Sequence, residues 1–308
     1  MCSLSRHKED LVIFVHVHYP EIWREVADHI AQTIDVPFRL IATFSLSDTA
    51  DIVRPRTPLL KEMQIIQTEN RGRDIRPFLV ALSYAGPFCV GLKLHTKKST
   101  HRLEGEEWRR AIISSLLAGR DETTALIAQM EKDKRLGLVG PQYSMLSIEP
   151  WMGDNSRQFK SIAHRLELAP DQMVTQCPRF IAGSMFWFTR AALISLVDTE
   201  LDDLFEPESG QTDGTAAHAF ERLFAPIAAT EGRLTVTVDI AEKLRNGYLE
   251  RSLEDLVKEA TDIDQIYLLT PHHAARFLAA RAPFLIGIYR GLPIWLRNSI
   301  RSLIRYRS

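Results

Sequence analysis

Two extended segments of this chain end abruptly in charged residues. The apolar run at 90–94 leads directly into the basic sequence His-Thr-Lys-Lys-Ser at 95–99. The run at 63–67 is soon followed by Glu-Asn-Arg-Gly-Arg-Asp at 69–74. If both runs are strands of one parallel sheet, both charged segments lie at the same sheet edge, where open α/β folds bind their ligands. We therefore expect an anion-binding site at that edge.

Alternation of apolar strands and amphipathic helices along the chain predicts an α/β fold. The predicted strands are 11–17, 38–44, 63–67, 88–94, 136–140 and 234–238. Residues 180–188 are expected to form a small-residue turn followed by an aromatic strand. The predicted helices are 20–34, 74–85, 106–130 (one helix or two), 190–197 and 213–224. Residues 144–160 are expected to be a loop or an insertion. We expect a Rossmann-like, mostly parallel sheet with flanking helices in a domain of residues 1–240, followed by an α-helical C-terminal extension at 241–308.

Composition narrows the classes of function. The 308 residues carry a formal net charge of −1, which argues against general affinity for nucleic acid. Three widely spaced cysteines lack the spacing of paired metal ligands and indicate a reducing, cytoplasmic compartment. The first residues lack the long apolar region of a signal peptide, and no stretch is long and apolar enough to span a bilayer.

The first candidate binding element is a glycine turn before the predicted helix at 74–85. It consists of Asn70, Arg71, Gly72, Arg73 and Asp74. Free amides and the helix dipole at a helix N-terminus favour an anion, and guanidinium groups add bidentate donors. The alternative is a solvated turn with ordinary surface arginines.

The second candidate is the basic segment at the end of the strand at 88–94. It consists of Lys93, His95, Thr96, Lys97 and Lys98. On an extended segment, alternation places the side chains of Lys93, His95 and Lys97 on one face, with a spacing suited to a diphosphate. The alternative is a strand end that becomes an exposed basic loop.

The third candidate is the segment Asp-Gly-Thr-Ala-Ala-His-Ala-Phe-Glu-Arg, which ends at Arg222. Helical spacing can present His218, Glu221 and Arg222 on one face. Glu208 and Asp213 come just before this helix, where a carboxylate could act as a base. The alternative is a capped amphipathic helix with an internal ion pair. A His-x-x-Glu pair could also be half of a metal site, but no partner ligands are apparent in the sequence.

Small residues form a fourth candidate element. Gly183 with Ser184 permits close approach of the backbone to a ligand. The aromatic residues that follow at 186–188 are expected in the core rather than on a stacking surface. We therefore assign Gly183 and Ser184, and not the aromatic run, to the candidate site.

The tail from Phe277 to Ser308 contains no acidic residue. Its arginines follow helical spacing beside an apolar stripe; they are Arg290, Arg297, Arg301 and Arg305. This pattern is typical of an interfacial helix attracted to anionic lipid, and predicts association with a membrane surface. The alternative is a terminal helix packed on the domain.

Together, the four candidate elements resemble the rhamnan synthesis F family. The matching segments are 70–74, 93–98, 182–187 and 213–222, in the order in which the family carries them. The resemblance covers about residues 10–240. It implies a role in bacterial rhamnose-containing polysaccharide and O-antigen assembly, and a divergent GT-A-like glycosyltransferase fold. It further implies transfer of a sugar from a nucleotide-diphosphate donor, with dTDP-rhamnose favoured, to a lipid-linked glycan.

The sequence departs from the usual GT-A pattern because the metal-binding Asp-x-Asp is missing. We therefore expect lysine and arginine to offset the diphosphate charge, with no metal site and no cofactor, although Mg²⁺ or Mn²⁺ is left open. By analogy with inverting GT-A enzymes, Asp213 is the expected base, with Glu208 and Glu221 in reserve. Residues assigned to the donor by the resemblance include Gly183, Ser184, His218 and Arg222.

Two other functions fit the same sequence. A non-catalytic nucleotide-sugar or glycan-binding subunit of a polysaccharide synthesis complex would bind without turnover. A phosphate-handling enzyme, such as a phosphotransferase, would move phosphate rather than sugar.

Overall fold

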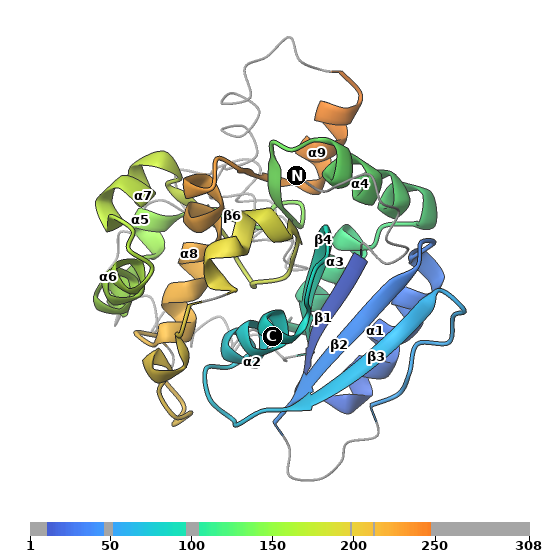
Figure 1. The fold of residues 1–308 in the computed structure, drawn as a ribbon, viewed down its shortest axis with the longest axis horizontal. Helices are drawn as coiled ribbons and strands as arrows, with labels where there is room; N and C mark the ends of the chain where they lie inside the picture. Colours follow the sequence, from blue (N-terminus) through green and yellow to red (C-terminus); the bar gives the residue numbers. More distant parts are fainter. Residues whose placement is uncertain (1–10, 46–51, 97–104, 198, 212, 248–308) are drawn as a thin grey trace, which may run out of the picture.

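Figure 1 shows the computed structural model, which describes residues 11–45, 52–96, 105–197, 199–211 and 213–247. Two of the predicted donor ligands, Lys97 and Lys98, lie outside the described residues, as does the basic tail. The helical extension expected at 241–308 is therefore described only as far as Gly247.

The core of the fold is a seven-stranded sheet with the order β3-β2-β1-β4-β8-β5-β9. Its strands are β1 (Leu11–Val17), β2 (Phe38–Phe44), β3 (Leu60–Gln67), β4 (Val90–His95), β5 (Leu136–Gly140), β8 (Phe186–Thr189) and β9 (Leu234–Thr237). Strands β1 to β4 are parallel, β5 is parallel to β9, and β8 runs antiparallel between β4 and β5. This topology confirms the predicted mostly parallel α/β sheet.

Helices cover both faces of the sheet (Figure 1). They are α1 (Pro20–Thr33), α2 (Ile75–Tyr84), α3 (Gly105–Leu116), α4 (Arg120–Lys132), α6 (Ser156–Arg165), α7 (Pro170–Gln176), α8 (Ala216–Thr230) and α9 (Val238–Arg245). Side chains of β1 alternate between two buried clusters. Ile13 belongs to the cluster that includes side chains of α1, α3, α4 and α9, and Phe14 to the cluster that includes side chains of α2, α6, α7 and α8. A strand buried on both faces must be apolar throughout, which explains the continuous run in the sequence.

The prediction of a loop at 144–160 is wrong. This part of the chain forms β6 (Met145–Ser147), α5 (Ile148–Trp151), the 3₁₀ turn η1 (Gly153–Asn155) and the start of α6. Strand β6 pairs with β7 (Arg179–Ile181) in a separate antiparallel sheet. Each element is too short to show a period of its own, and burial of Leu146 and Ile148 against Phe180 stabilises them together.

The predicted helix at 190–197 is also different. It is the 3₁₀ segment η2 (Arg190–Leu196), and Leu193 within it has non-helical backbone angles. The departure from regular α-helix accompanies burial of Ala192, Leu193 and Leu196 in one cluster. In the described part of the chain, no helix is long and apolar enough to cross a membrane.

Candidate functional site

Strands β3 and β4 end at the same edge of the sheet, as the sequence predicts. At this edge Thr96 is fully buried, and its hydroxyl accepts hydrogen bonds from the backbone N–H groups of His18 (2.8 Å) and Tyr19 (2.9 Å). Thr96 therefore ties the end of β4 to the connection between β1 and α1. These two hydrogen bonds give the Thr96 hydroxyl a structural role.

Lys93 points into the protein from the middle of β4. Its Nζ donates to Asp74 Oδ2 at 2.6 Å and to the carbonyl oxygen of Ser184 at 2.7 Å, and its side chain is 1% exposed. The ammonium also lies over the aromatic rings of Phe78, Phe186 and Phe224. This enclosure does not fit the prediction that Lys93 itself contacts a diphosphate.

The carboxylate of Asp74 is buried beside Lys93. Burial would raise its pKa, but the charges of Lys93 and His95 and hydrogen bonds from Lys93 and Ser184 outweigh burial. They hold the pKa of Asp74 well below its ordinary value, so its carboxylate stays ionised at neutral pH. Asp74 therefore contributes an internal ion pair rather than an N-terminal cap, and no side-chain capping hydrogen bond is formed at α2.

A turn made of Gly183 and Ser184, here called the Gly183–Ser184 turn, is held by side chains from three other segments. His95 Nε2 donates to the Gly183 carbonyl at 3.0 Å, and Glu221 Oε1 accepts from the Gly183 N–H at 2.7 Å. The Ser184 hydroxyl donates to Asp74 Oδ2 at 2.8 Å. All four segments singled out in the sequence therefore meet at this turn, and its two residues are fixed by charged side chains.

The backbone of the turn explains its small residues. Gly183 has φ +89° and Ser184 has φ +45°, both in the left-handed region that side chains disfavour. A Cβ added at position 183 would lie 2.8 Å from the indole of Trp108 and 3.2 Å from Ile112. Glycine is required at 183 both by its backbone angles and by the close packing of α3.

Glu221 and Arg222 form an ion pair on α8, with Oε2 and Nη1 3.0 Å apart. Arg222 is buried, donates to the carbonyl oxygens of Trp151 and His218, and packs over the ring of Phe180. This is the internal ion pair expected if the segment is only a capped amphipathic helix. In addition, Glu221 accepts a hydrogen bond from the Gly183–Ser184 turn. Arg222 thus braces Glu221 and joins α8 to the β6–β7 sheet.

His218 lies in the first turn of α8. Its Nδ1 is 2.8 Å from the hydroxyl of Thr215, which also caps the helix by accepting from the His218 N–H. The side chain is buried. These contacts place His218 in the cap of α8, as the alternative reading expects.

The arginines of the glycine turn contact acidic residues rather than open solvent. Arg71 Nη2 lies 2.6 Å from Asp202 Oδ2, and Asp202 also pairs with Arg76. Hydrogen bonding from Arg76 and the charge of both arginines lower the pKa of Asp202. These pairs connect the start of α2 to the 3₁₀ turn η3 (Asp202–Leu204).

Glu208 is bound by Arg73. Its Oε1 accepts from the Arg73 N–H at 3.1 Å, and its Oε2 lies 3.8 Å from Arg73 Nε. Arg73 also donates to the carbonyl of Gln211. The side chains of Arg73 and Glu208 remain 22% and 25% exposed, so both stay accessible at the rim. Asn70, next to this turn, is exposed.

Asp213 is held by the η1 turn. Its Oδ1 accepts from Asn155 Nδ2 at 2.6 Å, and its Oδ2 accepts from the Asp154 N–H at 3.3 Å. Burial would raise the pKa of Asp213, but these hydrogen bonds, one from the Gly214 backbone and the charge of Arg222 lower it overall. A lowered pKa makes the carboxylate a weaker base than an unperturbed aspartate.

Two residues of the site escaped prediction for different reasons. Asn155 is fully buried and orients Asp213, but it lies in the segment expected to be a loop. His16, aligned with His95 and Thr43 across the sheet, is bonded to the Thr43 hydroxyl through Nδ1 (3.1 Å). Burial lowers the pKa of His16 to about 3, although the charge of Asp74 opposes this. The motif His-Val-His at the end of β1 was the available signal for His16.

Metal coordination needs several ligands that converge on one point. Among the residues that the structure describes, no three His, Cys, Asp or Glu side chains are arranged to hold a metal ion. The charged side chains of Asp74, Lys93 and Glu221 instead form ion pairs or hydrogen bonds within the protein.

Most of the chain is similar to proteins of one described family. Residues 3–232 match the family described as rhamnan synthesis protein F. The uncharacterized protein WxcX from two strains of Xanthomonas campestris pv. campestris is 33% identical over 231 residues, which cover 74% of this chain and 32% of WxcX. A crystal structure of S. aureus TarS 1–349 superposes with a TM-score of 0.41 and 12% identity, covering 92% of this chain and 76% of TarS. The last similarity says nothing about shared chemistry, whereas the first two establish that the chain belongs to the rhamnan synthesis protein F family.

Proposed function

We propose that this chain is a glycosyltransferase domain of polysaccharide synthesis, which moves a sugar from a nucleotide-diphosphate donor to a growing glycan. The observation that carries the proposal is the meeting of four family segments at the Gly183–Ser184 turn, beside the carboxyl ends of parallel strands. In open α/β sheets this edge is where ligands bind. Membership of a rhamnan synthesis family supports rhamnose as the sugar and a GT-A-like relationship.

In this proposal, buried charged residues hold the Gly183–Ser184 turn, and more exposed cations contact the donor. Lys93, Asp74 and Glu221 hold the Gly183–Ser184 turn in its left-handed conformation. Direct contact with the donor diphosphate falls to more exposed cations: Arg71 and Arg73, whose side chains are 25% and 22% exposed, and the proposed ligands Lys97 and Lys98, next along the chain from Thr96. Cationic donors offset the charge that develops on a diphosphate leaving group.

Asp213 is the proposed base that takes the proton from the acceptor hydroxyl in an inverting transfer. Hydrogen bonds from Asn155 and the Asp154 backbone orient its carboxylate. The lowered pKa keeps Asp213 ionised at neutral pH, which a proton acceptor requires. Glu208 and Glu221 are the reserve candidates.

The remaining parts of the proposal concern partners. The donor is dTDP-rhamnose or a related nucleotide deoxysugar, the acceptor is a lipid-linked glycan, and transfer needs no metal ion. The protein works at the cytoplasmic surface of the inner membrane, held by its basic tail. Because the matched region covers 32% of WxcX, other parts of such relatives are candidates for additional steps.

A transfer assay tests the proposal. The full chain is incubated with dTDP-rhamnose, UDP-sugars or GDP-sugars and a lipid-linked acceptor, with EDTA or with Mg²⁺ or Mn²⁺. We expect glycan extension from one donor, retained in EDTA, and at least a ~100-fold loss of turnover in Asp213→Asn. Donor binding should survive that substitution, and unchanged turnover would remove Asp213 as the base.

A non-catalytic binding subunit is the second candidate. One observation favours it: Asp213, Glu208 and Glu221 all accept hydrogen bonds from the protein itself. It predicts a donor-dependent rise in melting temperature with no sugar transfer. Release or transfer of phosphate without sugar transfer would instead identify a phosphotransferase.

A further inference from the structure

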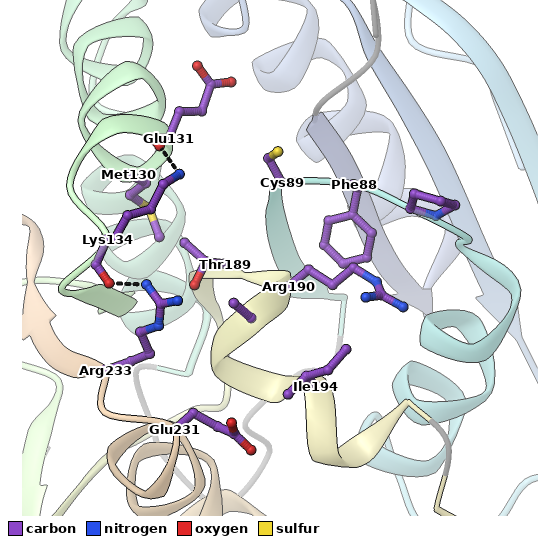
Figure 2. Close-up of a pocket in the computed structure, with 12 residues that line it drawn as sticks. Phe88, Cys89, Met130, Glu131, Lys134, Thr189, Arg190, Ile194, Glu231 and Arg233 are labelled. Atoms are coloured by element: carbon purple, nitrogen blue, oxygen red, sulfur yellow. Dashed lines mark hydrogen bonds between the residues drawn. The ribbon is translucent and has the colours of Figure 1, made fainter. Parts of the chain in front are cut away.

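A hollow of about 830 Å³ lies at the opposite edge of the sheet from the candidate site (Figure 2). It is bordered by the residues before β4, the end of antiparallel β8, the turn before β5 and the turn before β9. Parallel strands begin at this edge, so the proposed donor at their carboxyl ends cannot also occupy this hollow. The residues of the hollow have no part in the proposed transfer reaction.

Three cationic side chains line the hollow. Lys134 and Arg233 lie on one side of Thr189 and Arg190 lies on the other (Figure 2). Lys134 donates to the carbonyl of Glu131, and Arg233 donates to the carbonyl of Lys134. These two hydrogen bonds end on neutral backbone oxygens, so they do not neutralise the positive charge.

Arg190 is the most informative of the three. Its Nε is buried and has no hydrogen-bond partner within the described chain, where its guanidinium also forms no ion pair. A buried donor without an acceptor is unfavourable, so an acceptor supplied by a ligand is favoured. The two carboxylates of the lining, Glu131 and Glu231, are outnumbered by the three cations.

The remaining lining is partly apolar. Phe88 and Met130 are buried beneath the hollow, and Ile194 is half-buried on its wall. Cations on both sides of an apolar floor suit a ligand that carries phosphate on an organic body. Guanidinium groups match phosphate oxygens in a planar, bidentate geometry.

We propose that this hollow is a second ligand site, which binds a phosphate-bearing group through Arg190, Arg233 and Lys134. The group belongs either to a soluble phosphate ester or to a lipid headgroup. The site is separate from the proposed donor edge and does not depend on glycosyl transfer. A phosphate oxygen in the hollow would offer an acceptor to the Arg190 guanidinium, whose hydrogen bonding within the described chain is incomplete.

Isothermal titration calorimetry of the full chain with inorganic pyrophosphate tests the site. One charge-assisted hydrogen bond contributes about 1.5–3 kcal/mol. We therefore expect Arg190→Met and Arg233→Met each to weaken one binding event by roughly tenfold or more. Arg24→Met removes the same charge from the exposed surface of α1 and should leave that event unchanged. Arg190→Met should not lower the melting temperature without ligand, because it removes an unsatisfied buried donor.

A second arm separates the two sources of phosphate. Vesicles of phosphatidylcholine with phosphatidylglycerol are sedimented with wild-type protein and with the same three variants. Loss of co-sedimentation in Arg190→Met and Arg233→Met, but not in Arg24→Met, would identify a lipid headgroup; loss of pyrophosphate binding alone would identify a soluble ligand. The proposal is overturned if neither ligand binds, or if all three variants bind both ligands as the wild type does.

Discussion

Lys93 and Asp74 form a buried ion pair, with Nζ and Oδ2 2.6 Å apart, that joins the middle of β4 to the start of α2. Both residues also form hydrogen bonds with Ser184. Lys93 Nζ donates to the Ser184 carbonyl oxygen, and Asp74 Oδ2 accepts from the Ser184 hydroxyl. The pair therefore sets the position of the Gly183–Ser184 turn as well as joining two elements. Removing one partner of a buried ion pair leaves the other charge buried and unpaired, which is strongly destabilising, so the contribution of this pair to stability can be measured by substitution.

Lys93→Met should destabilise the protein by about 3–5 kcal/mol, because it leaves the Asp74 carboxylate buried without its cation. Urea denaturation at pH 7 measures the change. Adding Asp74→Asn to Lys93→Met should recover much of the loss, since neither position then carries a charge.

The matched control is Arg110→Met. Arg110 pairs with Glu25 and Glu106, but its side chain is 55% exposed. Exposed pairs of this kind contribute less than about 1 kcal/mol. If Lys93→Met costs no more than the control, the buried pair does not stabilise the fold.

Gly183→Ala should lose stability and, under the proposed function, most transfer activity. The new methyl group would meet Trp108 at 2.8 Å in a backbone conformation that already disfavours a side chain. Gly86→Ala is the control, because Gly86 has φ +61° with open space around its Cβ position. Thermal melts should show the larger loss for Gly183→Ala; equal losses would mean that backbone strain alone matters and that the packing of Trp108 does not.

Two substitutions of Glu221 distinguish a role in positioning the Gly183–Ser184 turn from a role as the base. Glu221→Gln keeps an oxygen that can accept from the Gly183 N–H, whereas Glu221→Ala removes it. If Glu221 positions the turn, Glu221→Gln should retain more turnover than Glu221→Ala, by roughly tenfold. Equal and complete inactivation of both variants, with normal melting temperatures, would instead support Glu221 as the base.

Stability should fall as the pH is lowered from about 6.5 toward 3. His16 has its pKa lowered to about 3 by burial, while an unfolded histidine titrates near 6.5, so the unfolded state binds the extra proton in this range. Unfolding is therefore favoured by acid, by up to about 1.4 kcal/mol per pH unit from this group. Below about pH 4, protonation of Asp74, whose pKa is lowered in the fold, removes further stability.

Denaturation curves of His16→Gln and wild type across this pH range check the prediction. The variant should show a shallower loss between pH 6.5 and 4. His164→Gln, which removes an exposed histidine from α6, should follow the wild type. A wild-type slope in His16→Gln would exclude His16 as the source.

The roles of individual site residues were harder to foresee than their grouping. Spacing placed Lys93 and His95 on one face of β4, and both do contact the Gly183–Ser184 turn. Nothing in the spacing reveals that Asp74, nineteen positions earlier, lies opposite Lys93. Spacing alone therefore predicts that Lys93 faces a ligand, whereas in the structure Lys93 pairs with Asp74 inside the protein. No local pattern marks Asn155, because its role is to orient Asp213, which is distant in the sequence.

The sequence by itself determined the α/β class, the parallel strands β1 to β4 and the four segments of the site, because burial and strand alternation leave local patterns in the chain. Tertiary structure alone decided that Lys93 faces inward, since its counter-charge, Asp74, comes from a segment distant in the sequence. It likewise decided the antiparallel insertion of β8 and the β6–β7 sheet. These depend on pairing between short segments whose own sequences carry little preference, so their stability comes from the neighbours that the fold brings to them.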